Sequence, residues 1–262
     1  MLSRLRFPLK TASFVGWTGA LYALLEAETA LSPEVAHRRL LHLWQGRYGR
    51  GLLRIWGVRV SPGGPGLRTD VLYPAADARG VGRLFVMNHR SALDIFIALA
   101  FAEATIVSRA DLAGWPVIGT AARRVGTLFV DRKSRSSGSA VVQAMANALG
   151  QGRGVLVFPE GTTFEGDEVR PFHVGGFAAA VRAGASVVPL GLTYERADTV
   201  FGEEEFSTHM KRVSGKRRIR AALQAGVPIS AEGHTAESLR DAAHASLQEL
   251  VLHARARIGG PL

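Results

Sequence analysis

The chain has 262 residues, of which 47% are hydrophobic, enough for one sizeable domain or a domain with an appendage. It contains no cysteine, which excludes disulfides, thiolate nucleophiles and cysteine-based zinc sites. Its 32 Lys and Arg against 22 Asp and Glu give a formal net charge of +10. This charge indicates an anionic partner such as nucleic acid, a phospholipid surface or a phosphorylated substrate.

The amino-terminal region is basic and contains a short apolar segment. Residues 1–60 hold nine basic and three acidic side chains, and the fifteen residues from Thr11 to Leu25 carry no charge. A membrane-spanning helix needs roughly 20 apolar residues. The segment therefore predicts a retained helix that is partly inserted in a membrane. Basic residues before an apolar run also suit a signal peptide, but the sequence that follows offers only a weak cleavage site.

A second amphipathic helix is predicted from Ser32 to about Ile55. Ser32, Pro33 and Glu34 supply a capping residue, a proline at the first helical position and an acid in the first turn. The segment mixes tryptophan and leucine with several arginines, as at a lipid headgroup interface. A helix packed on an ordinary core is the alternative. We interpret residues 1–60 as a membrane-associated helical region.

Residues 67–262 are predicted to form an α/β domain. The turn-rich stretch at 61–66 separates the two regions. After it, short apolar runs rich in branched residues alternate with helix-like segments near 92–101, 138–149 and 174–183. The expected strands are 83–87, 104–108, 126–130, 154–158 and 186–194. This alternation predicts a largely parallel sheet flanked by helices, with a site at the carboxyl ends of its strands.

His89 and Asp94 form a candidate pair at the end of the first of these strands. The segment Ser91 to Asp94 resembles a capping box, with Ser91 as cap and Asp94 as the third helical residue. Helical side chains lean toward the amino end, so this carboxylate can point back at a histidine in the preceding loop. A carboxylate on one imidazole nitrogen leaves the other free to take a proton. Taken alone, the two residues also fit a helix-dipole contact and an ordinary loop histidine.

Two further polar segments follow strands in the same way. Asp131 and Arg132 come directly after the strand 126–130, and Glu160, Gly161 and Thr162 follow the strand 154–158. Both segments are expected at the edge of the sheet where a parallel α/β fold keeps its site.

The blocks "NHRSALD", "GTLFVDR", "FPEGTT" and "VVPLGL" stand in an order and spacing that resembles the glycerolipid acyltransferases typified by bacterial 1-acylglycerol-3-phosphate acyltransferase. The resemblance covers roughly residues 80–195. It implies transfer of an acyl chain from acyl-CoA or acyl-carrier protein to a lysophospholipid hydroxyl, most simply 1-acylglycerol-3-phosphate giving phosphatidate. It also implies a bacterial enzyme on the cytoplasmic face of the cell membrane, bound to an anionic membrane surface.

In this interpretation His89 is the general base and Asp94 orients it. The substrate-binding residues are Asn88, Asp131, Arg132, Glu160, Gly161 and Thr162. Attack of an alcohol on a thioester needs a base, oxyanion stabilisation and exclusion of water, but no covalent enzyme intermediate. We therefore expect no metal and no cofactor beyond the acyl donor as co-substrate.

Two positions depart from the family pattern. Thr163 and His173 stand where the family often has arginine and lysine, which removes two cationic contacts. The departure leaves the acceptor open and makes lyso-ornithine lipid, or another lysolipid, the alternative substrate.

Other functional classes are weaker. A nucleic-acid-binding protein would explain the charge, but no recognisable binding module is present, so no nucleic-acid partner is expected. A basic membrane-binding protein without activity is a second alternative. A lipid hydrolase would share a histidine–aspartate pair, but the nucleophile motif Gly-x-Ser-x-Gly is absent.

Overall fold

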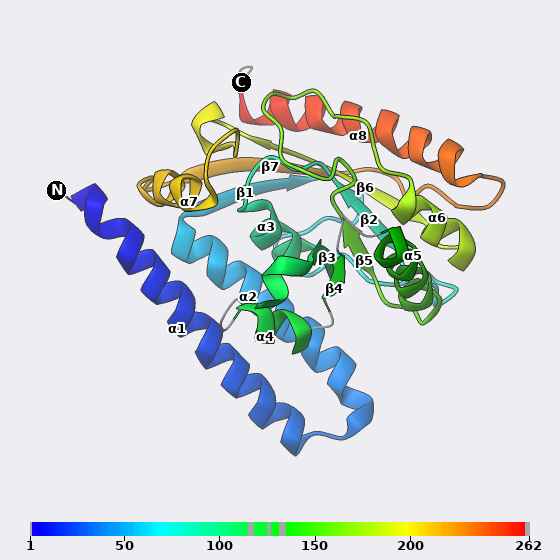
Figure 1. Ribbon diagram of the computed structural model, residues 1–262, viewed down its shortest axis with the longest axis horizontal. Coiled ribbons are helices and arrows are strands. Elements are labelled where there is room, and N and C mark those ends of the chain that lie inside the picture. The colour runs from blue at the N-terminus through cyan, green and yellow to red at the C-terminus, as the bar shows by residue number, and fades with distance from the viewer. Residues whose placement is uncertain (1, 115–117, 125–126, 131–134, 260–262) are drawn as a thin grey trace.

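The computed structural model describes residues 2–114, 118–124, 127–130 and 135–259. Their centre is a seven-stranded sheet with the order β1-β7-β6-β2-β5-β3-β4 (Figure 1). The strands are β1 (Val58–Gly63), β2 (Leu84–Met87), β3 (Thr105–Arg109), β4 (Leu128–Val130), β5 (Val155–Val157), β6 (Val187–Tyr194) and β7 (Ile219–Ala225).

The sheet is largely parallel, as the sequence predicts. All neighbouring pairs are parallel except β6 and β7, which pair antiparallel. The five expected strands are present as β2 to β6, although residue 126, at the start of the expected strand 126–130, lies outside the described residues. In the sheet centre Val86 pairs with both Val157 and Pro189, so the carboxyl ends of β2, β5 and β6 lie at the same edge.

Helices cover both faces of this sheet (Figure 1). Alternate residues of β2 point to opposite faces, as a strand requires. Phe85 and Met87 pack with α2 (His37–Trp56) and α3 (Asp94–Phe101), whereas Leu84 and Val86 pack with the helices of the other face. Those helices are α5 (Arg135–Gly150), α6 (Gly175–Ala183) and α8 (Ala236–Ile258). The three predicted helices of the α/β domain are therefore confirmed.

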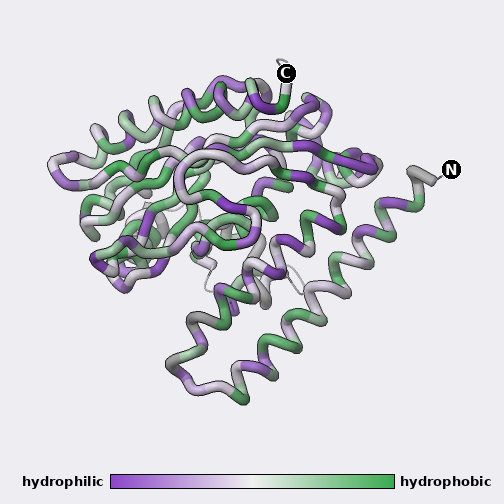
Figure 2. The backbone as a smooth tube through the Cα atoms, turned by 180° about the vertical axis from the view of Figure 1, so that it is seen from behind, coloured by the Kyte–Doolittle hydropathy of each residue, from purple (hydrophilic) through white to green (hydrophobic). Residues whose placement is uncertain are grey.

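The amino-terminal region is a helical hairpin. Helix α1 (Leu2–Leu31) contains the uncharged segment, and α2 follows after a short 3-10 turn, η1 (Glu34–Ala36). The hairpin extends beyond the α/β body, and α1 shows mixed hydropathy along its length (Figure 2). Leucines on α1 stay exposed, among them Leu9 at 67% and Leu31 at 89%. None of the described helices is long and apolar enough to cross a membrane.

The predicted division between residues 60 and 67 falls beside a strand that the sequence pattern did not indicate. Residues 61–63 complete β1, which pairs in parallel with β7 from Val58↔Ile219 to Gly63↔Gln224. The two-region division stays a prediction. The pairing nevertheless shows that the chain joins the sheet before the turn, because β1 finds its partner some 160 residues later.

The remaining helices surround the hairpin and the sheet edge. Helix α4 (Ile118–Arg124) and helix α7 (Phe206–Ser214) both contact α1. Arg6 of α1 donates to the Gly215 carbonyl just after α7, at 2.6 Å. Lys10 donates to the carbonyls of Trp56 and Lys216. Cations at helix carboxyl ends are favourable, so these contacts fix α1 on α2 and α7.

Candidate active site

His89 and Asp94 form the predicted pair. The His89 ring lies in the loop after β2, and its Nδ1 is 2.8 Å from Oδ2 of Asp94. Asp94 is fully buried. Its Oδ2 also accepts hydrogen bonds from the backbone N–H groups of Arg90 and Ser91, at 2.5 and 2.8 Å. The carboxylate is thus held by the loop that carries the histidine.

The start of the helix that carries Asp94 differs from the sequence prediction. Helix α3 begins at Asp94 with Leu93 as its N-cap, so Asp94 is the first helical residue and Ser91 is not the cap. The predicted capping box is therefore wrong. Residues 91–93 form a tighter turn in which the Leu93 N–H donates to Ser91 Oγ at 3.3 Å. The carboxylate still points back to His89 because it bonds the preceding backbone N–H groups.

The outer nitrogen of His89 is free to act on a substrate. Nε2 has no hydrogen-bond partner within the described part of the chain, and the side chain is 19% exposed. The ring of Phe158 stacks on the imidazole with centroids 4.2 Å apart. Because Nδ1 is engaged by a carboxylate, the neutral ring carries its proton there and presents Nε2 as an acceptor.

Glu160 supports the same loop from β5. Its carboxylate is buried and accepts from the His89 N–H at 2.6 Å, the Arg90 guanidinium at 3.1 Å and the Arg170 N–H at 2.9 Å. Both oxygens are therefore engaged within the protein. Contact between Glu160 and the acceptor stays a prediction.

The other predicted binding residues take varied positions. The Asn88 amide bonds both backbone groups of Leu192 in β6, at 2.7 and 2.8 Å, which ties its loop to the sheet. Gly161 has a φ of 81°, a conformation that favours glycine, and His173 packs against it. Thr162 is exposed beside it. Asp131 and Arg132 lie outside the described residues.

Two buried residues of the site were missed by sequence reasoning. Arg90 is only 1% exposed and pairs with Glu160. The hydroxyl of Tyr194, the last residue of β6, donates to Asp94 Oδ1 at 2.6 Å. Burial, and then the Asp94 charge, raises the pKa of Tyr194 well above its usual value, so it remains a donor. A tyrosine at the carboxyl end of a central strand was an available signal, whereas Arg90 resembled an ordinary loop arginine.

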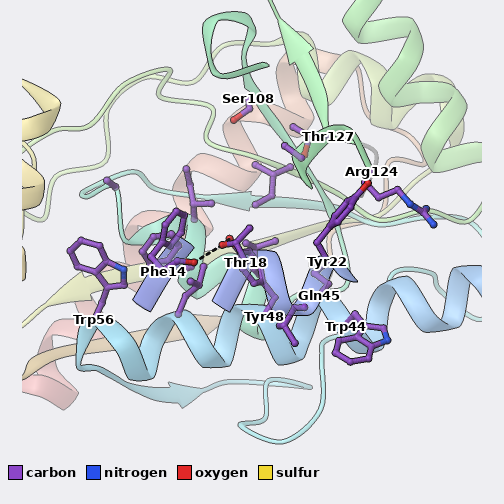
Figure 3. Close-up of a pocket in the computed structure, with 18 of the residues that line it drawn as sticks. Phe14, Thr18, Tyr22, Trp44, Gln45, Tyr48, Trp56, Ser108, Arg124 and Thr127 are labelled. Carbon is purple, nitrogen blue, oxygen red and sulfur yellow. Dashed lines mark hydrogen bonds between the residues drawn. The ribbon is translucent and has the colours of Figure 1, made fainter. Parts of the chain in front are cut away.

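An apolar cavity lies beside the loop and helix that carry this pair, and both helices of the hairpin line it. Its volume is about 520 Å³, and it is lined by α1, α2, α3, α4, α7 and the strands β3 and β4. Figure 3 shows Trp56 and Phe14 toward one end and Trp44 and Arg124 toward the other. Ala92, three residues after His89, is part of the wall, so the cavity reaches the loop that holds the pair. Cavities of about 300–1,000 Å³ are typical of small-molecule sites.

The combination of this loop, its buried ion pair and the parallel sheet defines a known class of protein. The family model described as Acyltransferase matches residues 75–193. A lyso-ornithine lipid O-acyltransferase from Pseudomonas aeruginosa is 32% identical over 244 residues, which cover 88% of each chain. The chain belongs to the acyltransferase family, and it is an acyl-transfer enzyme.

Other similar proteins carry related names. A 1-acyl-sn-glycerol-3-phosphate acyltransferase from Neisseria meningitidis is 31% identical over 162 residues, which cover 62% of this chain and 58% of that one. The crystal structure of a 1-acyl-sn-glycerophosphate acyltransferase from Thermotoga maritima superposes with a TM-score of 0.72. That comparison covers 97% of this chain and 96% of the other at 18% identity, so it supports the fold alone.

Proposed function

We propose that the enzyme transfers a fatty acyl chain from a thioester, acyl-CoA or acyl-carrier protein, to the free hydroxyl of a lysolipid. The observation that carries this proposal is the free Nε2 of His89, held by Asp94 beside an apolar cavity. The cavity suits a fatty acyl chain, because its wall is built mainly from aliphatic and aromatic side chains.

The proposed chemistry needs one base and no covalent enzyme intermediate. Nε2 of His89 takes the proton of the acceptor hydroxyl as its oxygen attacks the thioester carbonyl. Asp94 stabilises the imidazolium that forms. The tetrahedral intermediate then collapses, the carbon–sulfur bond breaks, and the leaving thiolate receives the proton from His89. The products are the acylated lipid and the free thiol, and the histidine returns to its starting state.

The direct test is purified protein with acyl-CoA or acyl-carrier protein and a panel of lysolipids, read by mass spectrometry. Acylated lipid together with free thiol in equal amounts would support the proposal. Release of free fatty acid without acylated lipid would instead assign a hydrolase.

The acceptor is proposed to be lyso-ornithine lipid or lysophosphatidate, and one observation favours the former. Thr163 and His173, at the edge of the site, supply no permanent cation for a phosphate, and His173 packs against Gly161. The Pseudomonas aeruginosa relative, which covers 88% of this chain, is also named for lyso-ornithine lipid. A zwitterionic head group demands less positive charge than a phosphate monoester.

Initial rates on the two acceptors and on uncharged monoacylglycerol are expected to rank lyso-ornithine lipid first. A charge-assisted hydrogen bond contributes about 1.5–3 kcal/mol, so cationic side chains added at these positions should strengthen the binding of a phosphate head group. We expect Thr163→Arg with His173→Lys to lower the KM for lysophosphatidate about tenfold and to leave the lyso-ornithine KM nearly unchanged. Faster use of lysophosphatidate by the unaltered enzyme would return the assignment to phosphatidate synthesis.

We also propose that the enzyme binds an anionic membrane surface, at the cytoplasmic face. The exposed leucines of α1 supply apolar contact, and the net charge of +10 supplies attraction to anionic lipid. The contact lies on the same hairpin that covers the cavity, so a lipid acceptor can reach the site from the bilayer.

Leu9→Glu with Leu31→Glu is expected to release most of the protein from liposomes of mixed neutral and anionic lipid. Both side chains are mainly exposed, so the change removes apolar membrane contact without opening the core. Val227→Glu is the matched control, because Val227 is 72% exposed and lies outside the helical hairpin, between β7 and α8. Equal sedimentation of the leucine variant and the control would show that α1 is not the anchor.

A further inference from the structure

Ser91 links the Asp94 carboxylate to a more distant part of the chain through its backbone N–H and its hydroxyl. It is fully buried, and its backbone N–H donates to Asp94 Oδ2 at 2.8 Å. Its hydroxyl oxygen accepts from the Leu93 N–H at 3.3 Å, while the other carboxylate oxygen, Asp94 Oδ1, accepts from the Tyr194 hydroxyl at 2.6 Å. The position of Oδ2, the carboxylate oxygen that contacts the His89 ring, therefore depends on Ser91.

A second histidine holds Ser91 from a distant part of the chain. Nε2 of His209, in α7, lies 3.0 Å from Ser91 Oγ, although the two residues are 118 positions apart. The His209 side chain is fully buried, and the ring of Phe201 stacks on it at 4.5 Å. Its Nδ1 lies 3.2 Å from Oε1 of Glu204. Both ring nitrogens are thus engaged, which fixes the imidazole in one orientation.

The neighbouring backbone reinforces this connection. The N–H of Phe201 donates to the Arg90 carbonyl at 2.7 Å, one residue before Ser91. Arg212 bonds Glu204 and the carbonyls of Asp198 and Val200, so the acid that faces His209 is itself held. The segment before α7 and the His89 loop therefore form one hydrogen-bonded unit.

The series serine, histidine and carboxylate has the residue types of a hydrolytic triad, but its burial assigns another role. A substrate carbonyl cannot reach the Ser91 hydroxyl, which is fully buried and already bonds His209. Burial, with the Arg212 charge, lowers the pKa of His209, which keeps the ring neutral at neutral pH. A neutral ring that donates from Nδ1 to Glu204 accepts at Nε2 from the Ser91 hydroxyl, and the Arg212 guanidinium also lies 3.2 Å from Nδ1.

We propose that His209 is a positioning residue, which fixes Ser91 so that Asp94 holds the His89 ring in its reactive tautomer. The inference rests on the proposed function of His89. Because Ser207 and Met210 of the same helix line the apolar cavity, the contact also connects the cavity wall to the catalytic pair.

The kinetic test compares His209→Leu, which removes both hydrogen bonds, with His209→Gln, whose amide can replace the contact to Ser91. We expect His209→Leu to lower kcat about tenfold, because a tenfold change in rate corresponds to the net contribution of about one hydrogen bond. The KM for both substrates should be nearly unchanged. His209→Gln should recover most of the loss. His234→Leu is the control, because His234 bonds Ser238 in a similar pair at the exposed start of α8. A change in KM alone, or no change in kcat, would overturn the proposal.

A double-mutant cycle separates positioning from a general structural role. Ser91→Ala should lower kcat by about the same factor, and adding His209→Leu to it should cost less than about twofold more, since both changes interrupt one connection. Additive losses would overturn the inference. If His209→Leu does not fold, Ser91→Ala and His209→Gln decide it, since unaltered kcat in Ser91→Ala contradicts the proposed connection.

The nitrogen-15 signals of the His89 ring give a readout that does not depend on turnover. The wild-type spectrum is expected to show the Nδ1–H tautomer, His209→Leu a mixture of tautomers, and His209→Gln the wild-type pattern. An unchanged tautomer in His209→Leu would overturn the inference. If the wild-type protein transferred no acyl group, the proposed function would fail, whereas these spectra would still test the positioning.

Discussion

His89→Ala is expected to lower kcat for acyl transfer about 10²- to 10⁴-fold, the usual contribution of a general base. The ring supplies the free Nε2 that takes the proton of the acceptor hydroxyl, whereas the neighbouring carboxylates of Asp94 and Glu160 are engaged by hydrogen bonds within the protein. The fold should persist, because the side chain is partly exposed and its backbone bonds to Glu160 and Phe164 remain.

Circular dichroism and thermal unfolding provide the fold check for this variant. His253→Ala is the matched control, since His253 is exposed on α8. Asp94→Asn should also reduce kcat strongly, because the amide keeps one acceptor oxygen but loses the charge that stabilises the imidazolium. A folded His89→Ala protein with near wild-type turnover would remove His89 from the mechanism.

Glu160→Gln is expected to destabilise the fold by about 3–5 kcal/mol, because it leaves the buried Arg90 guanidinium without a compensating charge. Both side chains are almost completely buried, and the pair joins the loop after β2 to the loop after β5. The expected change is a large fraction of the 5–15 kcal/mol of a typical domain. The measurement is the urea concentration at the midpoint of unfolding.

A second substitution tests whether the destabilisation comes from the uncompensated charge of Arg90 or from altered packing at residue 160. Arg90→Met added to Glu160→Gln should recover much of the free energy of unfolding, because no charge then remains buried. The exposed pair of Arg220 and Glu195, 2.7 Å apart, provides the control: Glu195→Gln should cost less than about 1 kcal/mol. Equal costs for Glu160→Gln and Glu195→Gln would show that the buried pair adds nothing special to stability.

These two predictions differ in how far the sequence anticipated them. The proximity of His89 and Asp94 follows from local geometry, since a loop residue and the first residue of the next helix are five positions apart. Glu160 was placed at the same sheet edge because both segments follow parallel strands. Its partner was not predicted, because nothing in the sequence around Arg90 distinguishes a buried arginine from an exposed one.

In the fold, too, some elements could be predicted from the sequence and others could not. Strands β2 to β6 were predicted because central parallel strands are buried on both faces and appear as continuous apolar runs. Strands β1 and β7 were missed: β1 ends in Ser61, Pro62 and Gly63, which resemble a turn, and its partner lies far along the chain. The start of α3 was misplaced because the Ser91 side chain bonds within a turn instead of capping the helix.

The sequence by itself determined the α/β class, the order of the central elements and the histidine–aspartate pair, because each depends on periodicity or on contacts within a few residues. Only the tertiary structure decided which groups surround that pair. Tyr194 and His209 approach the Asp94 loop from 100 and more residues away. The cavity likewise needs α1, α3 and β4 to meet. Such contacts depend on how separate elements pack, and no local pattern encodes that packing.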